Sequence, residues 1–125
     1  MLAIEMKFER EFAAAGGLLM AGCDPTGYGG VLPGFGDQRN LELLVEAGLT
    51  PLEAIRIATL NGAKFLDRDA DIGSVVIGKS ADLVVLGGDP AKDIDNIEKV
   101  ELVFKDGVGY DPAALIASFK TVGLR

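Results

Sequence analysis

Apolar and polar positions along the first part of the chain change from a helical period to a continuous run. Residues 2–15 carry apolar side chains at helical spacing with charged residues between them, and two glycines follow. This spacing predicts a helix that ends at Gly16 and Gly17. Residues 18–21 form a short apolar run without alternation, which is typical of a parallel strand buried on both faces. Asp24 would then lie at the C-terminal end of that strand.

The following residues change from a glycine-rich loop to two helices. Residues 26–36 contain five glycines and almost no charge, which predicts a loop over a site. Apolar residues at helical spacing then indicate a helix that ends at Gly48. A second helix is predicted to begin after Thr50 and to run to about residue 66, because Thr50 suits the N-cap position and Glu53 completes a capping box.

The period changes again in the second half of the chain. Short runs rich in β-branched residues occupy residues 74–77, 82–86 and 100–104, separated by turns that contain glycine. These runs predict three strands. A final amphipathic helix is predicted after Asp111, which suits the N-cap position.

The predicted elements do not close into a self-contained α/β sheet, because the strand at residues 18–21 has no parallel partner in this chain. Backbone N–H and C=O groups on both edges of such a strand would stay unpaired, which is costly unless a neighbour supplies partners. We therefore expect a missing N-terminal portion or an obligate assembly.

Composition narrows the functional classes. About half of the 125 residues are apolar (49%), and the formal net charge of −7 comes from scattered Asp and Glu. We expect a soluble globular domain that binds neither nucleic acid nor an anionic membrane. No apolar run approaches the ~20 residues of a membrane span. The single cysteine, Cys23, suits a reducing compartment, with the cytoplasm as the default.

Histidine, the commonest metal ligand and the usual general base near neutral pH, is absent from the sequence. Any chemistry must therefore depend on carboxylates, on Cys23 or on groups from elsewhere. Cys23 has no histidine to activate it and is expected to be a small buried side chain at a strand tip. An aspartate such as Asp24, followed by proline, is usually a turn former.

Three further patterns are similar to ligand-binding motifs in part only. The glycine-rich loop lacks a basic residue, so a flexible loop is favoured over a phosphate site. Gly78-Lys79-Ser80 lies between two predicted strands and is expected to form a hairpin turn. The aspartates at 67, 69 and 71 lack the glycine and the distal glutamate of an EF-hand, so a solvated linker is favoured.

Four pieces in order carry a resemblance to a known family. They are Gly22-Cys23-Asp24, residues 49–54, residues 58–64, and residues 72–86 with their Gly-Lys-Ser-Ala-Asp-Leu-Val-Val-Leu run. Together they resemble the C-terminal third of the amidohydrolase superfamily, nearest to an imidazolonepropionase-like or prolidase-like branch. The resemblance covers about residues 17–107, and the ordered combination is more specific than any single piece.

The resemblance implies an α/β fold that is the C-terminal fragment of a (β/α)8 amidohydrolase barrel plus part of the small β-sandwich, or composite, domain. Residues 1–66 would supply the last strand and helices of the TIM-type barrel. Residues 67–110 would form a β-sandwich segment and residues 111–125 a C-terminal helix. The missing barrel strands would explain the strand without a partner.

The resemblance also implies metal-dependent hydrolysis of carbon–nitrogen bonds in small amides, cyclic amides or dipeptide-like substrates. Catalytic groups of such barrels lie at the C-terminal ends of the strands. Asp24 matches the final-strand aspartate that binds the water activated by the metal and carries its proton. Asp24 would therefore be the catalytic residue, and a metal contact only with ligands absent from this chain. Tyr28 and Phe35 would form apolar walls of the substrate pocket.

The other ligands of that family have no matching positions in this chain: a His-x-His pair, a carboxylate or modified lysine, and two later histidines. A divalent metal, zinc in the first place, is expected for the full-length enzyme and none for the isolated chain, which should be inactive. Three hypotheses for the function of this chain stay open. They are a fragment of a hydrolase, a non-catalytic truncation product that forms a homo-oligomer, and a subunit that completes a split active site with Asp24.

Overall fold

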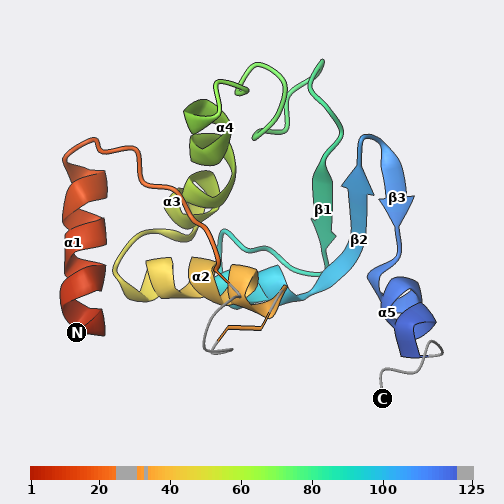
Figure 1. Cartoon of the computed structure of the whole chain (residues 1–125), viewed down its shortest axis with the longest axis horizontal. Coiled ribbons are helices and arrows are strands. Elements are labelled where there is room, and N and C mark those ends of the chain that lie inside the picture. The colour runs from red at the N-terminus through yellow and green to blue at the C-terminus, as the bar shows by residue number, and fades with distance from the viewer. Residues whose placement is uncertain (25–30, 33, 121–125) are drawn as a thin grey trace.

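The computed structural model of the chain describes residues 1–24, 31–32 and 34–120. Helices make up the first half, and a small sheet with a 3₁₀-helix and a terminal α-helix makes up the second half (Figure 1). In chain order the elements are α1 (Leu2–Ala14), α2 (Phe35–Glu46), α3 (Pro51–Arg56), a π-helical turn η1 (Ile57–Asn61), α4 (Gly62–Phe65), β1 (Leu83–Leu86), a 3₁₀-helix η2 (Ile94–Glu98), β2 (Val100–Lys105), β3 (Val108–Tyr110) and α5 (Pro112–Lys120).

The predicted helix starts are confirmed by their capping hydrogen bonds. The Thr50 hydroxyl accepts the backbone N–H of Glu53 at 3.3 Å, and the Glu53 carboxylate accepts the backbone N–H of Thr50 at 2.7 Å. Pro51 occupies the first turn of α3, where its missing N–H is not needed. Asp111 Oδ1 accepts two backbone N–H groups of the first turn of α5, at 2.8 and 3.1 Å.

The helix predicted from Thr50 to about residue 66 is confirmed, with one difference. α3, η1 and α4 follow one another without interruption. The middle turn is π-helical, and in such a turn the hydrogen bonds link each residue to the one five positions on. This turn contacts residues 19–21, since Asn61 and Ile57 both hydrogen-bond to that segment.

The core lies where α2, α3 and η1 meet. Its buried apolar cluster consists of four residues, Leu44, Leu49, Ala54 and Ile57. No large side chain in the described part of the chain is fully buried, so this core is thin. Within the same residues, no helix is both long and apolar enough to cross a membrane.

Helix α1 is confirmed, but its predicted apolar stripe does not face a core. α1 contains no buried residue, and only Ala13 packs against the central cluster. Ile4 and Phe8 are exposed instead. Figure 1 shows α1 at the edge of the molecule, at the opposite end from α5. The chain therefore leaves the apolar face of its first helix uncovered.

The three strands form one antiparallel sheet in the order β1-β2-β3. The predicted strands at residues 82–86 and 100–104 correspond to β1 and β2 and are confirmed. The turn after β2 contains Asp106 and Gly107, with φ of 49° and 79°. Positive φ at both positions is what a type I′ hairpin requires. β3 and η2 are not among the elements that the sequence pattern predicted.

Two predicted strands are wrong. Residues 18–21 and residues 74–77 lie outside any strand, because no other described strand pairs with either run. Residues 18–21 are also not buried on both faces, since their exposure alternates. In the second run Val75 and Ile77 are 86% and 103% exposed. Both runs have strand-like composition, yet strand pairing needs a neighbour.

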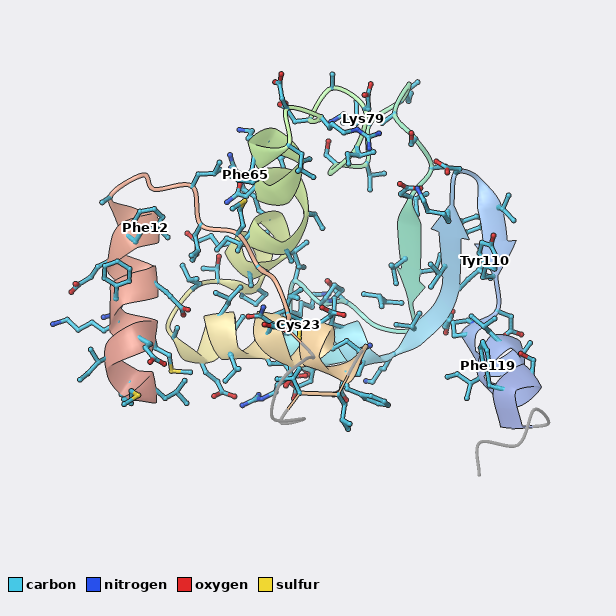
Figure 2. All side chains as sticks on the ribbon, in the orientation of Figure 1. Phe12, Cys23, Phe65, Lys79, Tyr110 and Phe119 are labelled. Carbon is cyan, nitrogen blue, oxygen red and sulfur yellow. The ribbon has the colours of Figure 1, made fainter. Side chains whose placement is uncertain are left out.

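The turn at Gly78-Lys79-Ser80 is therefore not a hairpin between two strands. Lys79 folds back into its own loop (Figure 2). Its ammonium donates hydrogen bonds to the backbone oxygens of Asp69 and Ile72, the second at 3.2 Å, and to the Ser74 hydroxyl at 2.7 Å. These internal bonds give Lys79 a structural role in residues 69–79.

Asp82 ties the start of β1 to the hairpin. Its carboxylate accepts a hydrogen bond from the backbone N–H of Asp106 at 2.8 Å. The same carboxylate forms an ion pair with the Lys105 ammonium at 2.8 Å. The hydrogen bond from Asp106, followed by that from Lys105, lowers the pKa of Asp82. Because the pKa of Asp82 is lower in the folded state, its ionised carboxylate stabilises the fold at pH values above the pKa of Asp in the unfolded chain. This stabilisation is lost as pH falls through the pKa of Asp82 in the folded chain.

Asp82→Asn is therefore expected to lower the urea midpoint at pH 7. The difference from the parent chain should shrink as pH falls below about 4, the unfolded value for Asp. Urea unfolding at both pH values measures it. Asp95→Asn on η2 makes the same charge change and serves as the control. A difference that persists unchanged at low pH would contradict this role for Asp82.

Candidate functional site

Asp24 lies at the end of an extended segment that is packed on one face only. Along residues 17–24, the odd positions are half-buried and the even positions exposed. Leu19 and Ala21 pack against the buried cluster of the helices. Asp24, like Leu18 and Met20, is one of the exposed even positions of this segment.

Helices α2 and η1 hold this segment in place of neighbouring strands. Asn61 at the end of η1 donates its side-chain N–H to the backbone oxygen of Leu19 at 2.8 Å. Asn40 on α2 donates to the backbone oxygen of Gly22 at 3.0 Å. The N–H of Ala21 also donates to the backbone oxygen of Ile57, at 3.5 Å. The route to Asp24 is thus fixed by side-chain amides and one backbone bond.

Cys23 lies directly against the first turn of α2 (Figure 2). A Cβ atom placed on Gly36 would come within 2.5 Å of the Cys23 sulfur and 2.3 Å of Val31. Only glycine therefore permits this approach of the segment to α2. Cys23 is half-buried, as a small packing side chain.

A hollow of about 410 Å³ opens beside Asp24. Its lining includes Asp24, Phe35, Arg39 and Asn40. The structure therefore brings together two of the predicted site residues, Asp24 and Phe35. Tyr28, the third, lies outside the described residues, as does most of the glycine-rich loop.

Phe35 reaches the hollow from a helix rather than from the predicted loop. Gly34 has a φ of 85° and is the N-cap of α2, which begins at Phe35. This left-handed conformation, which glycine adopts readily, turns the chain into the helix earlier than the apolar spacing indicated. The Phe35 ring is 70% exposed, so it offers an apolar surface to a ligand in the hollow.

Arg39 adds a cation to the same hollow and was not predicted. Its guanidinium bonds to Glu46 at 2.7 Å and to Glu42 at 2.8 Å. These two hydrogen bonds, that of Glu46 first, raise the pKa of Arg39 above its ordinary value. Arg39 stays charged, and both carboxylates compete with any anionic ligand for it. In the sequence, the spacing of three residues between Arg39 and Glu42 is the signal that could have indicated this ion pair.

The residues of this chain do not by themselves fit a divalent metal. Catalytic zinc sites take three protein ligands, chiefly His, Cys and carboxylates. Across the described parts of the chain, no three such side chains gather where they could hold an ion, and the sequence has no histidine. Asp24 can supply one carboxylate and accept or release a proton, but a metal site would need further ligands.

The sequence of the chain matches a known protein family. Residues 6–109 match the model of the amidohydrolase family, which is most of the chain. The chain belongs to the amidohydrolase family.

Individual relatives identify the imidazolonepropionase and prolidase branch of that superfamily. An imidazolonepropionase of Alkaliphilus metalliredigens is 34% identical over 83 residues, which are 60% of this chain and 20% of the relative. Solved structures of a Xaa-Pro dipeptidase and of phenylurea hydrolase B superpose with TM-scores of 0.58 and 0.73, at 38% and 33% identity. They cover 61% and 87% of this chain, which spans 19% and 27% of their lengths.

Proposed function

We propose that this chain supplies the C-terminal part of a metal-dependent amidohydrolase that hydrolyses carbon–nitrogen bonds in small non-peptide or dipeptide-like amides. The observation that carries the proposal is Asp24 at the end of a segment packed on one face, beside the hollow that Phe35 lines. The relatives named above, an imidazolonepropionase, a Xaa-Pro dipeptidase and a phenylurea hydrolase, support this substrate class.

Asp24 is the proposed catalytic residue. Hydrolysis of an amide needs a group that takes a proton from the attacking water and later delivers one to the leaving nitrogen. A carboxylate that is exposed at the end of a fixed segment is suited to both transfers. Phe35, and Tyr28 from the loop before it, are proposed as apolar walls for a small-molecule amide or cyclic amide.

The divalent metal of the complete enzyme, which we propose to be zinc, would take its remaining ligands from outside this chain. The isolated chain is therefore proposed to be inactive. Residues 18–24 are not a strand in this chain, but their exposed even positions support a complete barrel in which partners outside the chain would make them the last strand and residues 1–66 would supply that strand and its helices. The exposed run at residues 74–77 supports a sandwich segment at residues 67–110, followed by the terminal helix at residues 111–125. The single cysteine favours the cytoplasm.

A second candidate, self-association of the isolated chain as a homo-oligomer, is supported by its surface area. The chain exposes 9016 Å², whereas a folded monomer of 13.1 kDa exposes about 6,400 Å². The excess exceeds the ~800 Å² that each partner buries in a standard interface. Exposed apolar residues of α1, of the run at 74–77 and of α5 account for part of it.

Reconstitution of a complete barrel tests the proposed function. We would co-express this chain with the portion of the Alkaliphilus metalliredigens imidazolonepropionase that precedes the matched region. We expect a one-to-one complex that contains divalent metal by mass spectrometry and hydrolyses imidazolone propionate or a dipeptide, whereas each part alone is inactive. Stoichiometric metal or hydrolysis with this chain alone would contradict the proposal, and so would a complex without activity.

A further inference from the structure

The backbone that leads to Asp24 is held by two side-chain amides from separate helices. Asn61 and Asn40 donate to the backbone oxygens of Leu19 and Gly22, at 2.8 and 3.0 Å. In a sheet these oxygens would accept ladder hydrogen bonds from neighbouring strands. Here the amides take that place, at two points that lie before Asp24 on either side of Ala21.

Packing alone does not account for this arrangement. Leu19 and Ala21 press against the apolar cluster, which fixes the depth of the segment but not its position along the helices. Hydrogen bonds are directional, so two of them at separate points fix that position. The close approach of Cys23 to Gly36 follows, because the segment must be correctly placed before the sulfur can fit there.

The π-helical turn contributes to the same contact. A π-turn shifts hydrogen bonds by one residue relative to an α-helix. Ile57, the first residue of this turn, accepts the N–H of Ala21 with its backbone oxygen, and Asn61, the last, donates to Leu19. Both ends of η1 therefore bind the segment that precedes Asp24.

We propose that Asn61 and Asn40 are positioning residues that fix the backbone of residues 19–22 and thereby place Asp24 at the hollow. This inference rests on the proposed catalytic function of Asp24. Neither asparagine reaches the reacting atoms in this role. Each acts through a backbone oxygen of the segment, so that the Asp24 carboxylate stays in one place.

The single cysteine provides a readout that requires no activity. Cys23 is half-buried between the segment and α2, so its thiol reacts with a disulfide reagent faster when the segment leaves the helices. Asn61→Asp and Asn40→Asp keep the side-chain shape but turn an N–H donor into a carboxylate oxygen that repels the backbone oxygen. We expect each to raise the reaction rate of Cys23 about five- to tenfold, the factor that one lost hydrogen bond gives.

Asn96→Asp is the matched control. Asn96 also donates its side-chain amide to backbone oxygens, those of Asp89 and Asp93, both at 3.1 Å, but on η2. Its variant should leave the Cys23 rate within about twofold of the parent, below the effect of one hydrogen bond. Urea unfolding of all three variants separates a local opening from a general loss of stability. Unchanged Cys23 rates in Asn61→Asp and Asn40→Asp would overturn the inference, as would an equal rise in Asn96→Asp.

The reconstituted enzyme distinguishes this inference from the proposed function. Asn61→Asp should lower kcat there and leave KM nearly unchanged, because the proton-transfer group is displaced while the pocket wall at Phe35 stays. A faster Cys23 reaction without any change in kcat would retain the backbone role and remove the link to Asp24. The proposed function itself fails separately, when the complex with the unmodified chain is inactive.

Discussion

Replacing Asp24 with asparagine is expected to lower kcat of the reconstituted enzyme by about 10²- to 10⁴-fold, the range that a positioned proton-transfer group contributes. An amide cannot take a proton from water or return one near neutral pH, although it fills the same volume. KM for imidazolone propionate should change much less, because Phe35 and the rest of the hollow stay in place. Steady-state kinetics of the complex measure both quantities.

Asp37→Asn provides the control for that experiment. Asp37 lies in the first turn of α2, close to Asp24 in sequence, and the substitution makes the same change of charge. Its kcat should stay close to that of the unmodified complex. Retention of more than half of the activity by Asp24→Asn would remove Asp24 from the mechanism, and the catalytic group would then have to come from the other part of the barrel.

The helix ends and the turn at Asp106–Gly107 could be predicted because their causes are local, whereas the hairpin that this turn closes was not predicted, since β3 was missed. Thr50 and Glu53 lie within one turn of each other, and the Asp106–Gly107 pair carries the positive φ values of its turn. Such signals need only a few neighbouring residues. The strands at residues 18–21 and 74–77 could not be settled in this way, because a strand exists only when a distant segment pairs with it.

The candidate site was predictable to the extent that its residues are near one another in sequence. Asp24 and Phe35 line one hollow, although Asp24 ends a segment that is not a strand and Phe35 begins helix α2 instead of lying in a loop. The contacts of Asn40 and Asn61 join residues 18 and 42 positions apart. Nothing in the spacing of asparagines along a chain indicates which backbone oxygen they will meet, so these contacts needed the three-dimensional fold.

The uncovered face of α1 shows the same limit and leads to the second large expected effect. Helical spacing correctly predicted that Ile4, Phe8 and Phe12 share a face. It could not tell whether this chain covers that face. Phe8 is 67% exposed and stacks on Phe12, with ring centroids 6.2 Å apart. Exposed apolar faces of this kind are typical of interaction surfaces.

Phe8→Glu is expected to weaken self-association of the isolated chain about 30-fold. Burial of one phenylalanine side chain contributes about 2 kcal/mol, and this corresponds to about 30-fold in a dissociation constant. Light scattering across a range of concentrations should show oligomers for the parent chain and mainly monomer for the variant.

Lys7→Gln on the same helix changes the net charge by the same amount as Phe8→Glu, and Lys7 bridges to Glu11 within α1 at 3.7 Å. Its mass should match that of the parent chain. If both variants shift to monomer, charge rather than the apolar face controls association. If Phe8→Glu keeps the parent mass, the surface that associates lies elsewhere, and the exposed run from Val75 to Ile77 becomes the next segment to substitute.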